Sequence, residues 1–320
     1  MAEVMERAKA MQMSCENSKQ KSQPGDEEQY ECQDCKDSGK IVVRHFLKNE
    51  NGQPLIHPNG SPKYKDIAQQ CYCWEKRMLK KRFQNALIPD EFQEARLTTY
   101  RQDSEVQQTL FQATKEYLQS FDSIIHDRSE HNSLGFIAVV GESRIRSLDG
   151  SARAETKRKH NNFGLGKTHL QMAAAKWILN KARIRIPGDK YRPERTRGCS
   201  VLCVSDASFM DELSQAKRMN DEGKQLKDML HSATTVDVLV WDDLGKSKWS
   251  ETKEGLYYQI INERYRHKRP ILFSSNEDKA TLSEKIGYAA SSRLLGMCGE
   301  RLYEVEGEDY RLNKGEHHHV

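Results

Sequence analysis

Residues 163–170 read Phe-Gly-Leu-Gly-Lys-Thr-His-Leu, and this short run constrains the chain more than any other stretch. Its two glycines, Gly164 and Gly166, let backbone N–H groups curl around an anion, and the N-terminus of a following helix would add its positive end. Lys167 and Thr168 are the residue types that reach terminal phosphates and ligate Mg²⁺ in such loops. The run therefore predicts the end of a phosphate-binding loop that holds ATP and Mg²⁺.

The usual spacing G-x-x-x-x-G-K-S/T fails here, because Asn161 stands where the first glycine is expected. An apolar run of strand type, residues 136–140, instead ends at Gly141. Removing residues 143–162 joins Gly141 to the loop as Gly-Glu-Phe-Gly-Leu-Gly-Lys-Thr, which completes the motif. We therefore predict that residues 143–162 are an insertion that leaves the loop as a flexible, solvated bulge. The alternative is a basic finger that touches DNA phosphates.

A second apolar run, residues 236–241, ends in two carboxylates, Asp242 and Asp243. A buried strand would fix Asp242 beside Mg²⁺, and Asp243 could orient or deprotonate the attacking water. Glutamate is the usual residue at the second position, so the role of Asp243 as a base is left open. A third apolar run ends in Asn276, whose amide either reaches the γ-phosphate and the water or is a plain turn residue.

The composition describes a hydrophilic chain: 320 residues, 31% charged side chains and a net charge of +4. This length has room for a full domain and a smaller module. We find neither an apolar stretch long enough to span a membrane nor the apolar centre of a signal peptide, so we expect a cytoplasmic protein with no membrane partner. In a reducing compartment the eight cysteines are expected to be thiols or metal ligands.

Four of the cysteines form two closely spaced pairs, C-x-x-C at Cys32 and Cys35 and C-x-C at Cys71 and Cys73. Strand-like residues and two Asn-Gly turn signals lie between the pairs, which predicts a hairpin that brings the four thiolates together. Four thiolates suit a closed, tetrahedral Zn²⁺ site, and so small a module needs the metal to fold. We predict a zinc-ribbon-like domain over residues 30–75; four unrelated thiols are the alternative.

The remaining segments complete the domain organisation. Residues 1–29 contain a weakly amphipathic helix, which is either a frayed terminus or a docking segment for a partner. Residues 76–90 are expected to form a basic linker helix that ends at an Ile-Pro step, with its charges either solvated or in contact with nucleic acid. Residues 91–320 are then an α/β domain that holds the three motifs and the insertion.

The order of these motifs resembles that of bacterial and phage replicative-helicase loaders of the DnaC/DnaI type, which are AAA+ P-loop ATPases. The likeness covers the chain from Cys32 to Tyr310 and includes Gly-Lys-Thr-His-Leu, Asp-Asp-Leu-Gly, Ser-Ser-Asn and Ser-Arg-Leu. It implies a parallel sheet with flanking helices and a reduced or absent helical lid. It also implies a role for each matched residue: Lys167 and Thr168 for phosphate and Mg²⁺, Asp242 and Asp243 as the Walker B pair, Asn276 as sensor 1, and Arg293 as an arginine finger that reaches a neighbouring subunit's ATP.

The resemblance further implies a function. Such an ATPase would turn over slowly, hold the replicative helicase through its N-terminal region, and place it on single-stranded DNA during replication initiation as a homo-oligomer. A helper ATPase of a transposition system shares the core motifs, but it usually lacks a cysteine-rich N-terminal module. A third interpretation follows from the interrupted loop: a zinc and nucleic-acid adaptor that does not hydrolyse ATP.

Overall fold

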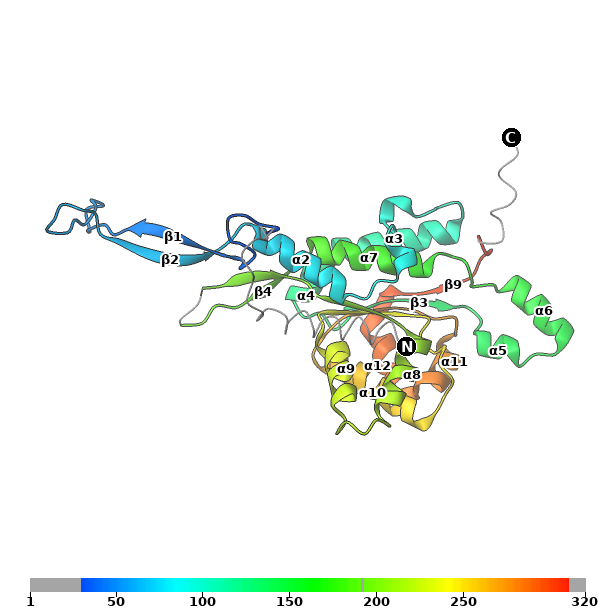
Figure 1. The fold of residues 1–320 in the computed structure, drawn as a ribbon. Coiled ribbons are helices and arrows are strands. Elements are labelled where there is room, and N and C mark those ends of the chain that lie inside the picture. The colour runs from blue at the N-terminus through cyan, green and yellow to red at the C-terminus, as the bar shows by residue number, and fades with distance from the viewer. Residues whose placement is uncertain (1–29, 191–192, 311–320) are drawn as a thin grey trace, which may run out of the picture. The chain divides into compact units, whose positions relative to one another are not determined.

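The computed structural model describes residues 30–190 and 193–310, which fall into two compact units divided between Lys76 and Arg77 (Figure 1). The helix expected within residues 1–29 lies outside the described residues. Helix α2 (Cys73–Asn85) spans the division between the units. Each unit is therefore described by itself.

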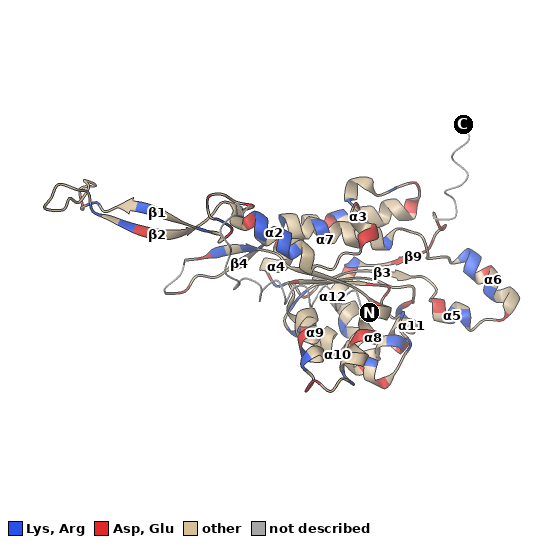
Figure 2. Cartoon of the chain, in the orientation of Figure 1, with Lys and Arg blue, Asp and Glu red and all other residues tan. Residues whose placement is uncertain are grey.

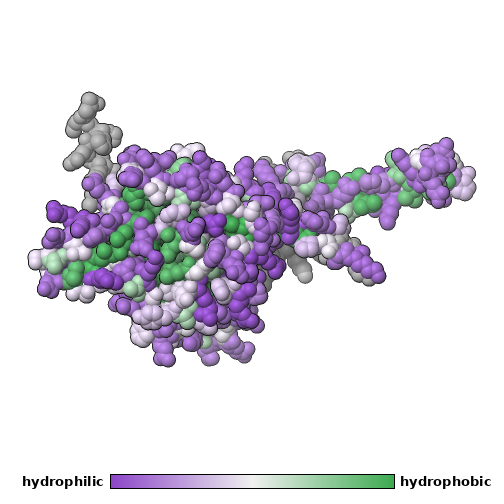
Figure 3. Space-filling model, turned by 180° about the vertical axis from the view of Figure 1, so that it is seen from behind, coloured by the Kyte–Doolittle hydropathy of each residue, from purple (hydrophilic) through white to green (hydrophobic). Residues whose placement is uncertain are grey.

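The smaller unit is a long antiparallel hairpin of β1 (Lys40–Phe46) and β2 (Tyr64–Gln70). Two isolated bridges, between Lys48 and Pro54 and between Ile56 and Pro62, extend it toward its tip. Apolar side chains lie on its surface among polar ones (Figure 3), and Val42 is 72% exposed. A two-stranded hairpin is marginally stable in water, so we expect the cysteine cluster at the base of the hairpin to stabilise this unit.

The larger unit is built on a five-stranded parallel sheet in the order β6-β7-β8-β3-β9. Its strands are β3 (Leu134–Ala138), β6 (Val201–Ser205), β7 (Val238–Asp242), β8 (Ile271–Ser274) and β9 (Leu302–Val305). Except for the partly exposed edge strand β9, they are nearly continuous apolar runs, as expected of strands buried on both faces. The sheet confirms the predicted α/β class with a parallel sheet. In such sheets ligands bind outside the carboxyl ends of the strands, where the strand order reverses.

Two apolar cores flank the sheet, because successive side chains of a strand point to opposite faces. Phe136 and Val240 belong to one core, and Ile137 and Trp241 belong to the other. The first core is covered by α3 (Glu105–Gln119), α4 (Phe121–His126) and α7 (Lys167–Lys181). The second is covered by α8 (Asp206–Ala216), α9 (Lys224–Thr235), α10 (Glu251–Arg266), α11 (Lys279–Ile286) and α12 (Tyr288–Cys298). Figure 1 shows these two helical layers on either side of the sheet.

Shorter elements connect these layers. They are the 3-10 turns η2 (Asp90–Phe92), η3 (Leu97–Thr99) and η4 (Gly299–Arg301), and an antiparallel pair, β4 (Arg183–Ile186) with β5 (Arg195–Gly198). Within residues 193–310, no helix follows β9. This agrees with the expectation of a reduced or absent helical lid.

A buried carboxylate ties the second core to the loop after β7. Asp206 accepts hydrogen bonds from Trp241 Nε1 at 3.0 Å and from the Tyr257 hydroxyl at 2.8 Å. It also accepts one from the backbone N–H of Ser247 at 2.8 Å. Burial raises the pKa of Asp206 from its ordinary value of 3.8 to about 6. This carboxylate therefore holds residues that follow Asp243 against the sheet.

The insertion was predicted to be a flexible, solvated bulge, and it instead contains two helices. The first is docked to the rest of the domain, contrary to the prediction, and the second is exposed to solvent, as predicted. These helices are α5 (Glu142–Arg146) and α6 (Gly150–Lys159). In α5, Ile145 is buried and Arg144 Nε donates to Asp278 Oδ2 at 3.1 Å, which fixes that helix to the residues after β8. In α6, alanine, glutamate, lysine and arginine have high helix propensity. The absence of apolar periodicity concealed both helices in the sequence.

Candidate functional site

A cleft of about 890 Å³ opens at the carboxyl ends of β7 and β8, beside the start of α7. It combines segments that are far apart in the sequence, including Tyr310 near the end of the described chain. Seven of the predicted site residues line it: Gly164, Gly166, Lys167, Thr168, Asp242, Asp243 and Asn276. The position matches the ligand site expected of a parallel sheet.

The phosphate loop has the backbone geometry that its glycines predict. Gly164 and Gly166 have φ angles of +67° and +81°, values that L side chains rarely adopt. Gly166 is also the N-cap of α7, so the positive end of that helix faces the cleft. The hydroxyl of Tyr100 donates to the carbonyl oxygen of Leu165 at 2.7 Å, and its ring would lie 2.6 Å from a Cβ added at Gly166. The loop is thus held in shape from beneath by a buried tyrosine.

A hydrogen-bonded series joins the loop lysine to the second acidic residue. Lys167 Nζ is buried and donates to the carbonyl oxygen of Asn162 at 2.9 Å and to Asn276 Oδ1 at 3.0 Å. Asn276 Nδ2 in turn donates to Asp243 Oδ1 at 2.9 Å. The Asn276 amide therefore lies between a cation that can reach a γ-phosphate and a carboxylate that can orient water.

The other acidic residue pairs with the loop threonine. Thr168 Oγ1 and Ser274 Oγ donate to Asp242 Oδ1 at 2.9 Å and 2.7 Å. Burial, and then the neighbouring Asp243 carboxylate, raise the pKa of Asp242. A divalent cation would reverse this effect, because its charge favours the ionised carboxylate. A hydroxyl and a carboxylate at this spacing are the oxygen ligands that Mg²⁺ takes, so Thr168 and Asp242 fit such an ion.

Gly141 does not reach the cleft. It caps α5 instead, and its N–H donates to Asp278 Oδ2 at 2.9 Å. A donor already bonded to a carboxylate is not available to a phosphate, and the anionic side chains of Glu277 and Asp278 beside it would repel one. The structure thus corrects the proposed reconstruction, in which Gly141 opened the loop; Asn162 lines the cleft in its place.

Arg293 is also not among the residues that line the cleft of its own chain. It lies on α12, where Nη1 donates to the carbonyl oxygen of Ala289 at 2.8 Å. Its guanidinium carbon lies 5.2 Å from the ring centroid of Tyr258 and 6.0 Å from that of Tyr265. Arg293 therefore does not line the ATP site of its own subunit, and its role as a finger in a neighbouring subunit stays a prediction.

Residues that the sequence did not single out complete the loop's surroundings. The segment after β9 lies against the start of the loop, because the N–H of Gly307 donates to the carbonyl oxygen of Asn161 at 2.7 Å and Asn161 Nδ2 donates back at 2.6 Å. His160 Nδ1 lies 2.7 Å from Glu306 Oε2. These pairs join residues about 146 positions apart, so no local motif could have indicated them.

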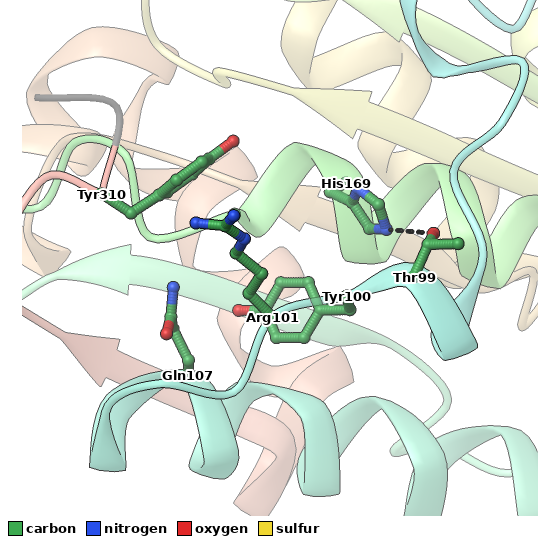
Figure 4. A pocket seen from close by; sticks show the side chains of 7 residues that line it. Thr99, Tyr100, Arg101, Gln107, His169 and Tyr310 are labelled. Atoms are coloured by element: carbon green, nitrogen blue, oxygen red, sulfur yellow. Dashed lines mark hydrogen bonds between the residues drawn. The ribbon is translucent and has the colours of Figure 1, made fainter. Parts of the chain in front are cut away.

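A smaller pocket of about 210 Å³ adjoins Gly166 (Figure 4). Tyr100, Arg101, Gln107 and Tyr310 line it, and Thr99 and His169 close one side with a side-chain contact of 3.4 Å. Its walls combine aromatic rings with hydrogen-bonding groups, a lining suited to a planar polar group beside the phosphate loop.

The four paired cysteines of the smaller unit form a cluster. The Sγ atoms of Cys32, Cys35, Cys71 and Cys73 all lie within 4.8 Å of one another. The Cys32–Cys71 and Cys35–Cys73 sulfur distances are 3.7 Å and 3.4 Å. A tetrahedron with metal–sulfur bonds of about 2.3 Å has edges of about 3.8 Å, so the cluster fits Zn²⁺.

The local backbone supports this cluster. The Asp37 carboxylate accepts hydrogen bonds from the N–H groups of Glu31 and Cys32, each at 3.1 Å. The backbone N–H of Cys35 lowers the pKa of the Cys32 thiol to about 6, which favours the thiolate form that binds metal.

Together, the strand order and the motif positions define a class. A Lys-Thr loop precedes α7, two carboxylates end the neighbouring β7, and an asparagine follows β8. This arrangement is that of an AAA+ P-loop NTPase fold. In the part of the chain that the structure describes, no helix is both long enough and apolar enough to cross a membrane.

Comparison with known proteins shows which members of this fold class the chain is similar to. Residues 161–317 match the family model of IstB-like ATP binding proteins, so the chain carries an IstB-like ATP-binding domain. The phage-like element PBSX protein XkdC of Bacillus subtilis is 25% identical over 298 residues, which cover 90% of this chain and 87% of XkdC. The replicative helicase loader DnaC of Escherichia coli is 25% identical over 131 residues, 41% of this chain and 46% of DnaC. The resemblance to helicase loaders is thereby confirmed at the level of homologues.

Among solved structures, a crystal structure of the DnaC helicase loader is similar to this chain. It has 21% sequence identity and a TM-score of 0.46, and the match covers 65% of this chain and 96% of that one.

Proposed function

We propose that this protein is an ATP-dependent loader of a replicative DNA helicase onto single-stranded DNA. The observation that carries the proposal is the complete set of polar contacts in the cleft: Lys167 with Asn276, Asn276 with Asp243, and Thr168 with Asp242. An inactive adaptor would have no need for so many buried or half-buried polar groups in mutual contact. The homology with DnaC, a replicative helicase loader, supplies the context of replication, and XkdC is a protein of a phage-like element.

In the proposed reaction, the phosphate loop and Lys167 bind and orient the β- and γ-phosphates. Thr168 and Asp242 would hold Mg²⁺, which neutralises charge that develops on the phosphate oxygens. Asp243 orients the attacking water, and Asn276 keeps that carboxylate and the lysine in register. Arg293 would approach the ATP of an adjacent subunit in a homo-oligomer assembled on the helicase.

We assign the segments to tasks in the same way. Residues 30–75 would hold Zn²⁺ through the four clustered cysteines and, with residues 1–29, bind the helicase. Residues 76–90 would link this module to the ATPase domain of residues 91–320. The homology with DnaC supports this assignment because that relative's name describes a replicative helicase loader.

The test of the ATP site compares two lysines of the same helix. Lys167→Ala should abolish ATP binding or turnover, because it removes the cation of the phosphate loop itself, whose Nζ contacts Asn276 in the cleft. Lys181→Ala removes an exposed lysine at the far end of α7 and should leave both unchanged. If wild-type protein binds no ATP at millimolar concentration by calorimetry, the adaptor interpretation holds instead.

The loading role has its own test. Purified protein should capture the host replicative helicase. With ATP, it should increase the unwinding of a duplex by helicase that is loaded on an adjoining single-stranded region of DNA. A transposition helper remains the competing function, because the matching family model is that of IstB-like proteins of IS21 type. Binding to a transposase together with no binding to the helicase would favour that function.

A further inference from the structure

Helix α6 of the insertion is an exposed basic helix. None of its residues is buried, and it carries four basic residues, Arg153, Lys157, Arg158 and Lys159, against the single acid Glu155. Figure 2 shows these cations along the helix and toward its C-terminal end. A helix that buries nothing contributes little to the fold, so its charges need another explanation.

The cations of α6 differ from those of α5 in their pairing. Arg144 of α5 pairs with Asp278 at 3.1 Å, and Arg146 pairs with Glu142. Across residues 30–190 and 193–310, none of the four basic side chains of α6 has an ion pair or a side-chain hydrogen bond. The positive charges of α5 are thus used in ion pairs within the chain, and those of α6 are available to a ligand.

We propose that α6 binds the phosphate backbone of single-stranded DNA and that this contact acts on the ATP site. The chemistry of the helix favours a polyanion over a protein partner. Protein interfaces have an apolar centre and are depleted in lysine, whereas the only apolar side chains of α6 are Ala152 and Ala154. Clustered lysine and arginine on one element are the electrostatic feature of nucleic-acid binding.

The connection to the ATP site runs through the three residues that follow α6. His160 lies against Glu306, Asn161 exchanges hydrogen bonds with Gly307, and the carbonyl oxygen of Asn162 accepts Lys167 Nζ at 2.9 Å. A displacement of the end of α6 therefore moves an acceptor of the phosphate-binding lysine. By linkage, ATP then changes the affinity for DNA by the same factor that DNA changes the affinity for ATP.

This inference rests on the proposed function for its choice of DNA, and its test keeps the two separable. The variant is Lys157→Gln/Arg158→Gln/Lys159→Gln, because glutamine removes charge with little loss of helix propensity. The matched control, Lys157→Arg/Lys159→Arg, changes the side chains and keeps the charge. The probe is a fluorescent oligothymidylate, whose anisotropy is measured at several salt concentrations with and without ATP.

The three lost charges should reduce the slope of log K against log salt concentration by about 2, since each contact with single-stranded phosphate contributes about 0.7. DNA affinity should fall at least about tenfold at low salt, and the Lys→Arg control should match the wild type. The glutamine variant should keep the wild-type ATP affinity without DNA and lose the change in ATP affinity that DNA causes. Circular dichroism and the melting temperature show that it remains folded.

Three outcomes would overturn the inference: an unchanged salt slope, an unchanged effect of DNA on ATP affinity, or loss of helicase binding with DNA binding intact. The last would identify α6 as a site for an acidic protein. Failure of the loader function has a different signature. Wild-type protein would then bind DNA through α6 and still not bind the helicase.

Discussion

Replacing Tyr100 with phenylalanine removes a single oxygen atom from beneath the phosphate loop. The hydroxyl of Tyr100 donates to the carbonyl oxygen of Leu165 at 2.7 Å, and the residue is only 8% exposed. A hydrogen bond of this kind contributes about 1 kcal/mol net to stability. The ring still stacks on Phe111, at a centroid distance of 6.3 Å, so packing is retained. We expect the melting temperature to fall by about 2–4 °C, as for a loss of that size in a domain of this length.

The same bond should matter more to ATP than to the fold. Without it, the carbonyl of Leu165 is free to turn, and the loop must be ordered when the nucleotide binds. If the whole contribution of this hydrogen bond, about 1 kcal/mol, is lost from the free energy of ATP binding, ATP affinity falls about fivefold. Calorimetric titration of ATP into the folded variant measures this.

Tyr117→Phe is the matched control for this prediction. Tyr117 is also buried, and its hydroxyl donates to the carbonyl oxygen of Asn132 at 2.8 Å, which lies outside the phosphate loop. Both variants should lose similar stability, and only Tyr100→Phe should lose affinity for ATP. Equal ATP affinities in the two variants would refute the idea that this bond holds the loop ready for phosphate.

Three further predictions follow from the cysteine cluster, from α12 and from the buried carboxylate of α8. Protein purified without added metal should contain one Zn²⁺ per chain by elemental analysis, and Cys71→Ser should lower that content; an unchanged content would contradict the site. Arg293→Ala should keep ATP affinity and lower turnover, and mixing it with Lys167→Ala chains should restore some activity at hybrid interfaces, whereas a loss of affinity would place Arg293 in its own subunit's site. The pKa of Asp206 is raised to about 6, so the native state binds more protons than the unfolded state between about pH 4 and pH 6. The free energy of unfolding should therefore fall by about 3 kcal/mol as pH rises through this interval. Urea denaturation of wild type and Asp206→Asn should show a smaller pH dependence in the variant, and equal pH dependences would exclude Asp206 as the cause.

The sequence predicted those parts of the site that short windows encode. Lys167 and Thr168 follow glycines, and Asp242 and Asn276 end apolar runs; each pattern is complete within about eight residues. Parallel strands then bring these side chains together, because their carboxyl ends meet at one edge of the sheet. The cysteine cluster could also be predicted from the sequence, since the spacing of its pairs and the turn signals between them imply a hairpin.

The surroundings of the phosphate loop could not be predicted in this way. The placement of Gly141 depends on where α5 docks, which is determined by carboxylates at positions 277 and 278. Tyr100 contacts the loop residue Leu165, which lies 65 positions after it in the sequence. Gly307 contacts Asn161, which lies 146 positions before it. Such contacts leave no periodicity in the sequence. Helix α6 escaped prediction because its polar residues form a helix without an apolar stripe.

The path of the chain through α5 and α6 has a consequence for the order of folding. In an uninterrupted P-loop fold, strand, loop and helix are neighbours in sequence and can assemble early, since nearby segments meet at a low entropic cost. In this chain the loop follows a detour that is anchored to residues 276–278 and 307. Those anchors lie more than 100 residues further along the chain, and contacts of such long range form slowly. The nascent chain should therefore become able to bind nucleotide only after synthesis has passed β9, so that an incompletely translated protein would not capture ATP.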